Sequence, residues 1–184
     1  MTVWSLTLHA AMDSMSDDEL EEVTGTGFAD FTLNSGIARA AFNIEARTYT
    51  EIESLKMGFY DNGLSTGWDQ DWISVSLGSA STDLVVKGFY IEAAFANISD
   101  PATRTLQSIK VGTPDMTGPI TATFNSFSGS ITDTANVTLV QGSRMNLGTA
   151  TITSTNSAFS AALTVSGVEK GWWITWTNAA ISTP

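Results

Sequence analysis

The 184-residue sequence contains no cysteine, one histidine (His9), and only 8 lysine and arginine residues against 19 acidic ones. The absence of cysteine excludes disulfide bonds, thiolate nucleophiles and cysteine-ligated zinc or iron–sulfur sites. A serine–histidine–acid triad would have to use His9, and a histidine-rich metal site is impossible. Because the net charge is −11, the cations are too few for a basic patch, and we expect no nucleic-acid partner.

Long apolar runs and complete catalytic motifs are missing as well. No segment approaches the ~20 residues that cross a bilayer, so we expect no membrane insertion. The sequence holds no G-x-S-x-G, phosphate-binding loop or dinucleotide fingerprint, and we predict a protein without enzymatic activity. Residues 1–11 lack the basic start and the cleavage site of a signal peptide, so they are either a signal remnant or a genuine strand.

Threonine, serine, asparagine and glycine are abundant, and they surround short apolar stretches with a period of two. In "DWISVSL", Ile73, Val75 and Leu77 face one way while the intervening serines face the other, which is typical of a half-buried antiparallel strand. Turn signals such as "DNG" at 61–63 separate these stretches. About ten such strands predict one all-β domain over residues 28–184, an antiparallel β-sandwich or jelly roll.

Residues 14–25, "SMSDDELEEVTG", have the pattern of one short α-helix in this β-rich chain. Ser16 suits the N-cap position, and Glu19 completes a capping box. Gly25 suits the end of the helix. A helix this short is marginal alone, so it has to dock through its apolar side chains. These docking residues are Met15, Leu20 and Val23.

Residues 3–10 have the alternation of an amphipathic strand. Its apolar face consists of Trp4, Leu6, Leu8 and Ala10. Such a strand either completes its own sheet or is added to the sheet of a neighbouring molecule. A head-to-tail contact of the second kind builds an open filament, whose partner is another copy of the chain. We therefore treat residues 1–27, with this strand and the short helix, as a unit that precedes the β domain.

The segment "MDSMSDDELEEVTG" resembles the start of mature chains in a poorly characterised family of secreted gammaproteobacterial surface proteins. Some members of that family are encoded with fimbria-like filament genes. The pattern D-x-x-L-x-x-V-T-G is matched by Asp17, Leu20, Val23, Thr24 and Gly25. The resemblance implies a bacterial protein that is extracellular or at the cell surface. Together with the amphipathic strand, it leads us to expect a structural subunit of a surface filament, pilus or fimbria that self-assembles.

Tryptophan suggests an alternative function, a lectin-like module that binds carbohydrate. Exposed aromatic rings on a β-sandwich stack on sugar rings, and the candidate platform consists of Trp68, Trp72, Trp172 and Trp176. Trp172 and Trp176 share a strand face, whereas Trp173 points the opposite way. The competing interpretation is that these rings belong to the core or to an interface.

Acidic side chains offer two further alternatives. Hard oxygen ligands gather in "YDNGLSTGWDQD", where a structural calcium ion would use Asp61, Asn62, Asp69 and Asp71. The segment does not match the EF-hand loop, and a solvated turn explains it better. Glycoside hydrolysis requires two carboxylates across a groove. Glu51 and Glu53 lie two apart, as a carboxylate pair on one strand face would, and so do Asp69 and Asp71. Apart from calcium we predict no cofactor.

Overall fold

The protein is described by a computed structural model that covers residues 28–61, 63, 65–165 and 170–183. Within these residues there is no helix, and the strands join in one hydrogen-bonded sheet. In chain order they are β1 (Ala29–Asn34), β2 (Ile37–Thr48), β3 (Thr50–Asp61), β4 (Thr66–Leu77), β5 (Leu84–Ala96), β6 (Thr105–Thr132), β7 (Thr138–Met145), β8 (Gly148–Thr164), β9 (Gly171–Trp176) and β10 (Ala179–Ser182). The predicted all-β class is confirmed, and the predicted N-terminal helix lies outside the described residues.

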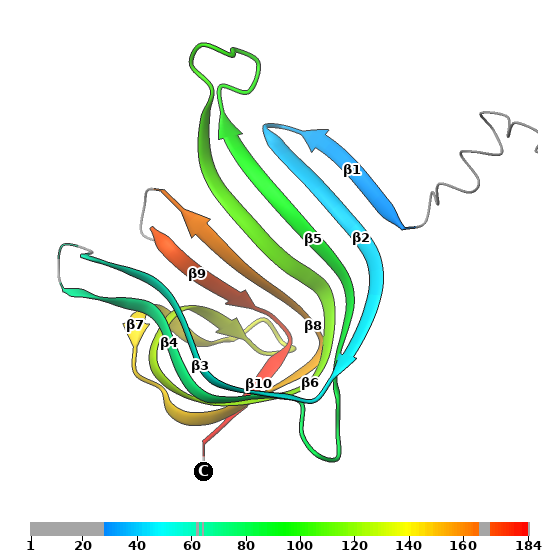
Figure 1. Ribbon diagram of the computed structural model, residues 1–184, viewed down its shortest axis with the longest axis vertical. Helices are drawn as coiled ribbons and strands as arrows, with labels where there is room; N and C mark the ends of the chain where they lie inside the picture. Colours follow the sequence, from blue (N-terminus) through cyan, green and yellow to red (C-terminus); the bar gives the residue numbers. More distant parts are fainter. Residues whose placement is uncertain (1–27, 62, 64, 166–169, 184) are drawn as a thin grey trace, which may run out of the picture.

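The long strand β6 organises the sheet because it changes neighbours along its 28 residues. Residues 108–117 lie between β5 and β8, and residues 120–126 have β4 on one side. Residues 127–132 pair with β7, and residues 129–131 pair in parallel with β9. Since β9 also pairs with β8, β6 curls back toward its own partner, as Figure 1 shows.

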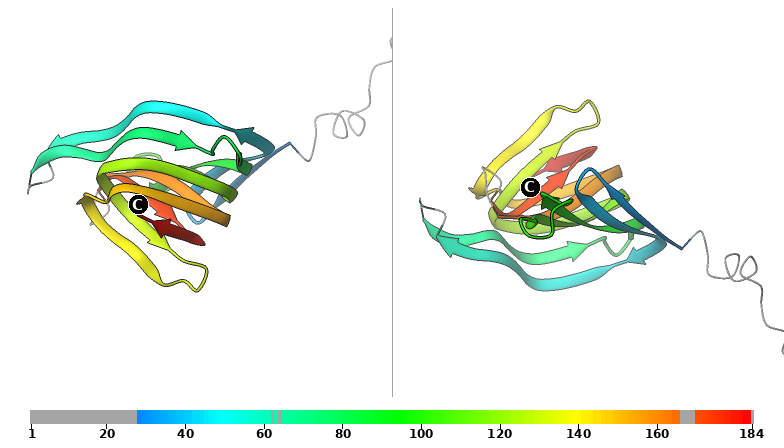
Figure 2. Two further views of the ribbon diagram at one scale, coloured as in Figure 1. Left: turned by 90° about the horizontal axis from the view of Figure 1, so that it is seen from below. Right: turned by 90° about the horizontal axis from the view of Figure 1, so that it is seen from above.

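The sheet is therefore mixed, and the expectation of a purely antiparallel arrangement is wrong at the contact between β6 and β9. A β-sandwich requires two sheets packed face to face. Here all the described strands belong to one continuous, strongly curved sheet (Figures 1 and 2), so the sandwich or jelly roll is not confirmed. The strands β1, β2 and β5 form one end of this sheet, which we call the wing, and β5 joins it to β6 (Figure 1).

The core lies inside the curl, between side chains of β4, β6, β8 and β9. Trp72, Phe124 and Phe127 form its aromatic centre, with ring centroids 4.9 Å apart for Trp72–Phe124 and 6.1 Å for Phe124–Phe127. Ile131 and Ile174 are fully buried beside them. Aromatic pairs in such edge-on geometry add to the free energy gained by burying their surface.

One predicted alternation is wrong, because β4 contains an irregularity at Ser74. The pairing of β4 with β6 shifts register between Ile73 and Ser76, and Ser74 has a φ of 51°. An extra residue in one strand reverses the side-chain phase beyond it. As a result Trp72 and Val75 are both buried, whereas Ile73 faces solvent.

Candidate assembly surface

β1 is a free edge, since β2 is its only neighbour among the described strands. The amide N–H of Asn43 donates to the carbonyl of Phe28 at 2.8 Å, which makes these two residues a hydrogen-bonded pair. Hydrogen-bonded and non-hydrogen-bonded pairs alternate along antiparallel strands. The N–H and C=O groups of Ala29, Phe31 and Leu33 therefore point away from β2, toward the open edge.

The two large residues with outward backbone groups also expose their side chains. Phe31 is 74% exposed and Leu33 is 68% exposed. The strand register places Phe31 beside Ala40 of β2 and Ile91 of β5, and it places Leu33 beside the alanines of the next row. We call this surface the apolar face, and it consists of Phe31, Leu33, Ala38, Ala40, Ile91 and Ala93.

The apolar face continues into the core without a polar interruption. Ile91 pairs with Val111 of β6, which pairs with Ala161 of β8. Val111 packs against the core and Ala161 is buried. The row of paired apolar residues that starts at Phe31 therefore runs from solvent at β1 to the interior at β8. A depression of about 460 Å³ lies over β1, β2 and β5. Uncovered apolar surface of this kind typically marks an interaction site.

The opposite face of the same strands carries the charge. Glu92 lies between two cations, with its Oε1 3.1 Å from Arg39 Nη1 and its Oε2 3.3 Å from Lys110 Nζ. The guanidinium of Arg39 also lies over the ring of Tyr90 at 4.2 Å. The wing formed by β1, β2 and β5 is therefore amphipathic, polar on one side and apolar on the other.

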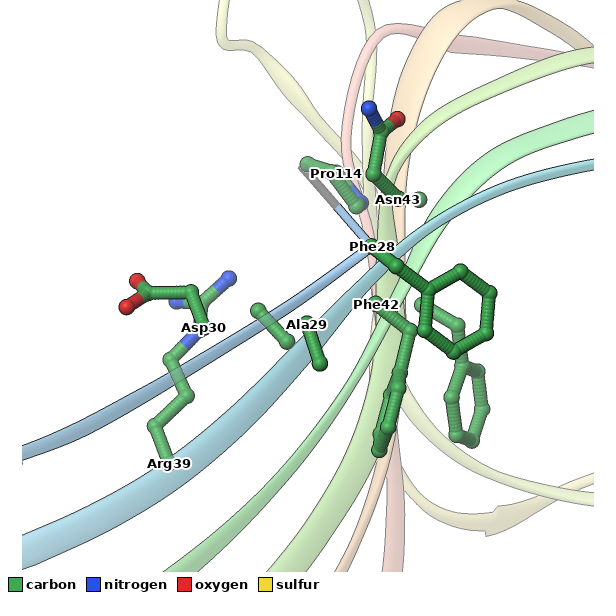
Figure 3. Close-up of a pocket in the computed structure, with 10 residues that line it drawn as sticks. Phe28, Ala29, Asp30, Arg39, Phe42, Asn43 and Pro114 are labelled. Atoms are coloured by element: carbon green, nitrogen blue, oxygen red, sulfur yellow. The ribbon is translucent and has the colours of Figure 1, made fainter. Parts of the chain in front are cut away.

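An aromatic cluster lies at the base of β1. The ring of Phe42 is 6.3 Å from that of Phe28, 6.4 Å from that of Phe31 and 6.2 Å from that of Phe89. Figure 3 shows the rings of Phe28 and Phe42 together, pointing away from the polar atoms of Asp30. A cavity of about 250 Å³ is lined by Phe28, Phe42, Phe89 and Pro114, among others. Phe28 therefore ties the start of β1 to the neighbouring strands.

The predicted tryptophan platform is divided between the core and the surface. Trp72 and Trp176 are buried, at 4% and 0% exposure, so their rings are not accessible to a sugar. Trp172 is half-buried and packs against the core. Trp68 is half-buried at the surface, where its ring centroid lies 5.0 Å from that of Phe59. Trp173, predicted to point the opposite way, is also buried.

Asp69 is the centre of a buried polar cluster that joins distant strands. Its side chain is 1% exposed, and its Oδ1 lies 3.2 Å from Arg144 Nε of β7. Its Oδ2 accepts the backbone N–H of Trp172 at 2.9 Å. Arg144 also donates to the carbonyls of Tyr60 and Ser65. One carboxylate thus fixes β4, β7 and β9 against one another.

Two glycines leave the space that the Asp69 carboxylate occupies. A Cβ atom added at Gly58 or at Gly171 would lie 2.3 Å from Asp69 Oδ2, and both residues have positive φ. Tyr60 also lies next to the Asp69 cluster, and its hydroxyl donates to the carbonyl of Lys170 at 2.7 Å. Burial raises the pKa of the Tyr60 hydroxyl above 10.0, and the negative charge of Asp69 raises it further.

The described acidic residues do not form a metal site, since no three acidic or histidine side chains converge among them. Of the calcium candidates, Asp69 is paired with Arg144, and Asp71 lies 3.3 Å from Lys56 Nζ. Asp61 is exposed and accepts the N–H of Gly63, and Asn62 lies outside the described residues. Bound calcium therefore stays a prediction, without a converging set of ligands to support it.

The paired glutamates predicted for glycoside chemistry are both exposed on β3. The hydroxyl of Tyr49 donates to Glu51 Oε1 at 2.8 Å, and this hydrogen bond, followed by the Glu51 charge, raises the pKa of Tyr49 above 10.0. Glu51 and Glu53 line a polar surface depression together with Ser74 and Ser76. Nothing in this arrangement places one carboxylate across a groove from the other.

The residues predicted for strand addition and for helix docking lie outside the described residues. They are Trp4, Leu6, Leu8, Ala10, Met15, Leu20 and Val23. Within the described residues, no helix is long and apolar enough to span a membrane.

No family model matches the chain, and neither curated proteins nor solved structures show a match to it. The resemblance of residues 12–25 to secreted surface proteins therefore stays a prediction.

Proposed function

We propose that the protein is a bacterial extracellular structural subunit that assembles into a surface filament by β-strand addition at β1. The observation that carries this proposal is the free edge of β1, whose outward backbone groups belong to residues with exposed apolar side chains. Edge strands normally carry lysine, proline or a bulge that prevents pairing with another chain. β1 has none of these protections, and its one charged residue, Asp30, projects from the face opposite Phe31 and Leu33.

The other described edges are protected. β3 pairs only with β4 among the described strands, but it carries Glu51, Glu53 and Lys56. β10 has four residues. The edge strand β7 holds Arg144 at a φ of 51° and shifts register twice against β6. Among the described edges, β1 therefore has the fewest features that would prevent pairing with an incoming strand.

The incoming strand in this proposal is residues 3–10 of a neighbouring copy. Its apolar residues Trp4, Leu6 and Leu8 alternate with polar ones, and so do Phe31 and Leu33 in β1. If the apolar side chains of the incoming strand lie on the same side of the sheet as Phe31 and Leu33, pairing would extend the apolar face by one strand. It would also satisfy the outward backbone groups of β1. The predicted two-layer sandwich belongs to the same proposal, because the extended apolar face then requires a covering layer.

A proline at position 31 tests the edge itself. The Phe31 N–H points away from β2, so Phe31→Pro removes a donor at the open edge without removing a hydrogen bond to β2. Phe31→Ala is the matched control, since it removes the ring and keeps the N–H. We expect the full chain and Phe31→Ala to form fibres in negative-stain microscopy, and Phe31→Pro to remain monomeric with an unchanged circular dichroism spectrum. Fibres of folded Phe31→Pro, or a wild-type chain that stays monomeric when concentrated, would contradict the proposal.

Carbohydrate binding is the second candidate function, and one observation favours it. Phe59 is 59% exposed and its ring lies beside that of Trp68, which gives an accessible aromatic pair on neighbouring strands β3 and β4. Lys56 Nζ lies 5.9 Å from the Trp68 ring. Calorimetric titration with soluble oligosaccharides tests this candidate. Binding that is lost in Trp68→Ala and kept in Phe31→Pro would establish it independently of assembly.

A further inference from the structure

The apolar face has no covering layer among the described residues, and its position beside the start of β1 indicates what covers it. Phe31, Leu33 and Ile91 are 74%, 68% and 41% exposed. The face contains no charged side chain, because the ion pairs of Arg39, Glu92 and Lys110 lie on the reverse side. A sheet with one polar and one apolar side buries the apolar side against another element.

We propose that residues 14–25 of the same chain cover the apolar face, with Met15, Leu20 and Val23 packed against Phe31, Leu33 and Ile91. The position of residues 14–25 in the chain supports their assignment to this face. Twenty-seven residues precede the described part of the chain, and they join it at Phe28, immediately before the edge strand of the face. Only residues 26 and 27 separate the segment from Phe28, so it starts beside the surface that it would cover.

The chemistry of the segment complements the face. Leu20 and Val23 lie three residues apart and share one side of a helix, and Glu19 lies at the border of that side, four residues after Met15 and four before Val23. The remaining acidic residues, at 17, 18, 21 and 22, would stay in water. Between the N-cap Ser16 and Gly25 the predicted helix has about eight residues and is about 12 Å long, which is enough to cross three strands about 4.8 Å apart. A short tether also gives the segment a millimolar effective concentration at the face, an advantage that a second copy lacks.

Disulfide cross-linking of the full chain tests this proposal without interference, because the chain has no native cysteine. The test pair is Leu20→Cys with Leu33→Cys. The control pair is Leu20→Cys with Thr32→Cys, whose second cysteine lies on the same strand but on the opposite face. At submicromolar protein and under mild oxidation, we expect the test pair to form an intramolecular disulfide at least about tenfold faster than the control pair.

Equal cross-linking rates for the two pairs would overturn the proposal. A disulfide that forms only between molecules would also overturn it, by showing that a second copy supplies the covering segment. Because the reaction is intramolecular and dilute, its result does not depend on filament formation. A failure of strand addition is therefore distinguishable from a failure of this proposal.

Thiol reactivity provides a second measurement. In a chain with Leu33→Cys as its only cysteine, adding Leu20→Asp should raise the rate of maleimide labelling roughly tenfold, because the covering segment is released. The same change should leave labelling of Thr32→Cys unaltered. If Leu33→Cys already reacts as fast as a free thiol before Leu20 is changed, the face is uncovered and the proposal fails.

Discussion

At the scale of single residues, the ion pair between Asp69 and Arg144 determines how the distant strands meet. The two side chains are 1% and 9% exposed, so neither charge is solvated by bulk water. Breaking a buried pair is costly because it leaves the other charge buried without a partner. We expect Asp69→Asn to lower the free energy of unfolding by about 3–5 kcal/mol in urea titrations.

Glu45→Gln is the matched control for this change. Glu45 lies on β2 and pairs with Arg47, and their side chains are 44% and 63% exposed. A solvent-exposed ion pair contributes about 0–1 kcal/mol. If the two variants lose the same stability, Asp69 does not hold the strands together in the way that its contacts indicate.

Tyr60 gives this cluster a predicted pH dependence. Burial, followed by the charge of Asp69, raises the pKa of its hydroxyl above 10.0. Between pH 10 and the raised pKa, only the unfolded chain releases the proton, so the free energy of unfolding falls as the pH rises. Tyr60→Phe removes this contribution.

The expected result for Tyr60→Phe has two parts. Below pH 10 the variant should be less stable by about 0.5–1.5 kcal/mol, because the hydrogen bond to Lys170 is lost. Above pH 10 the difference from the wild type should shrink. Urea midpoints measured across this range decide the matter, and a difference that stays constant with pH would show that the hydroxyl titrates normally.

At the scale of secondary structure elements, β6 carries much of the core. Phe124 is fully buried and contacts Trp72 and Phe127. Phe124→Ala should therefore lower the free energy of unfolding by about 3–5 kcal/mol. Leu139 of the edge strand β7 is 43% exposed, and Leu139→Ala should change stability by about 0.5 kcal/mol or less. Comparable losses in the two variants would place the core elsewhere.

Local pattern predicted the strands well and their arrangement poorly. Alternation identifies β4 from the sequence "DWISVSL", but it cannot reveal the irregularity at Ser74 that buries Val75 and exposes Ile73. Turn residues do not show that β6 runs for 28 residues or that it meets β9 in parallel. These features arise from non-local pairing, which leaves no periodic signal in the chain.

The candidate sites show the same limit. Asp69 stands out in the sequence as a calcium ligand because oxygen donors surround it there. Its actual partner, Arg144, lies 75 residues away, and no spacing rule connects the two. For the tryptophans, composition identified the aromatic residues but could not separate buried Trp176 from surface Trp68. The alternation of Phe31 and Leu33 in "FADFTLN" was the one local signal of the exposed face, but only the topology shows that β1 is an edge.

At the scale of the whole molecule, the net charge of −11 opposes any association between copies. The proposed contact at β1 is apolar, so salt should screen the repulsion without weakening the contact itself. Charges interact over about 30 Å at 0.01 M ionic strength and over about 8 Å at 0.15 M. We therefore expect the critical concentration for assembly, measured by light scattering, to fall as sodium chloride is raised across this range.

A charge-reduced variant separates screening from other effects of salt. Asp61→Asn with Asp83→Asn removes two exposed negative charges away from the apolar face, which changes the net charge from −11 to −9. At low salt this variant should assemble at a lower concentration than the wild type, because the repulsion between copies is smaller. At high salt the two chains should behave alike, since screening has already removed the difference. An assembly that instead dissolves as salt is added would mean that ion pairs hold the copies together, and the apolar contact at β1 would then not be the one that drives association.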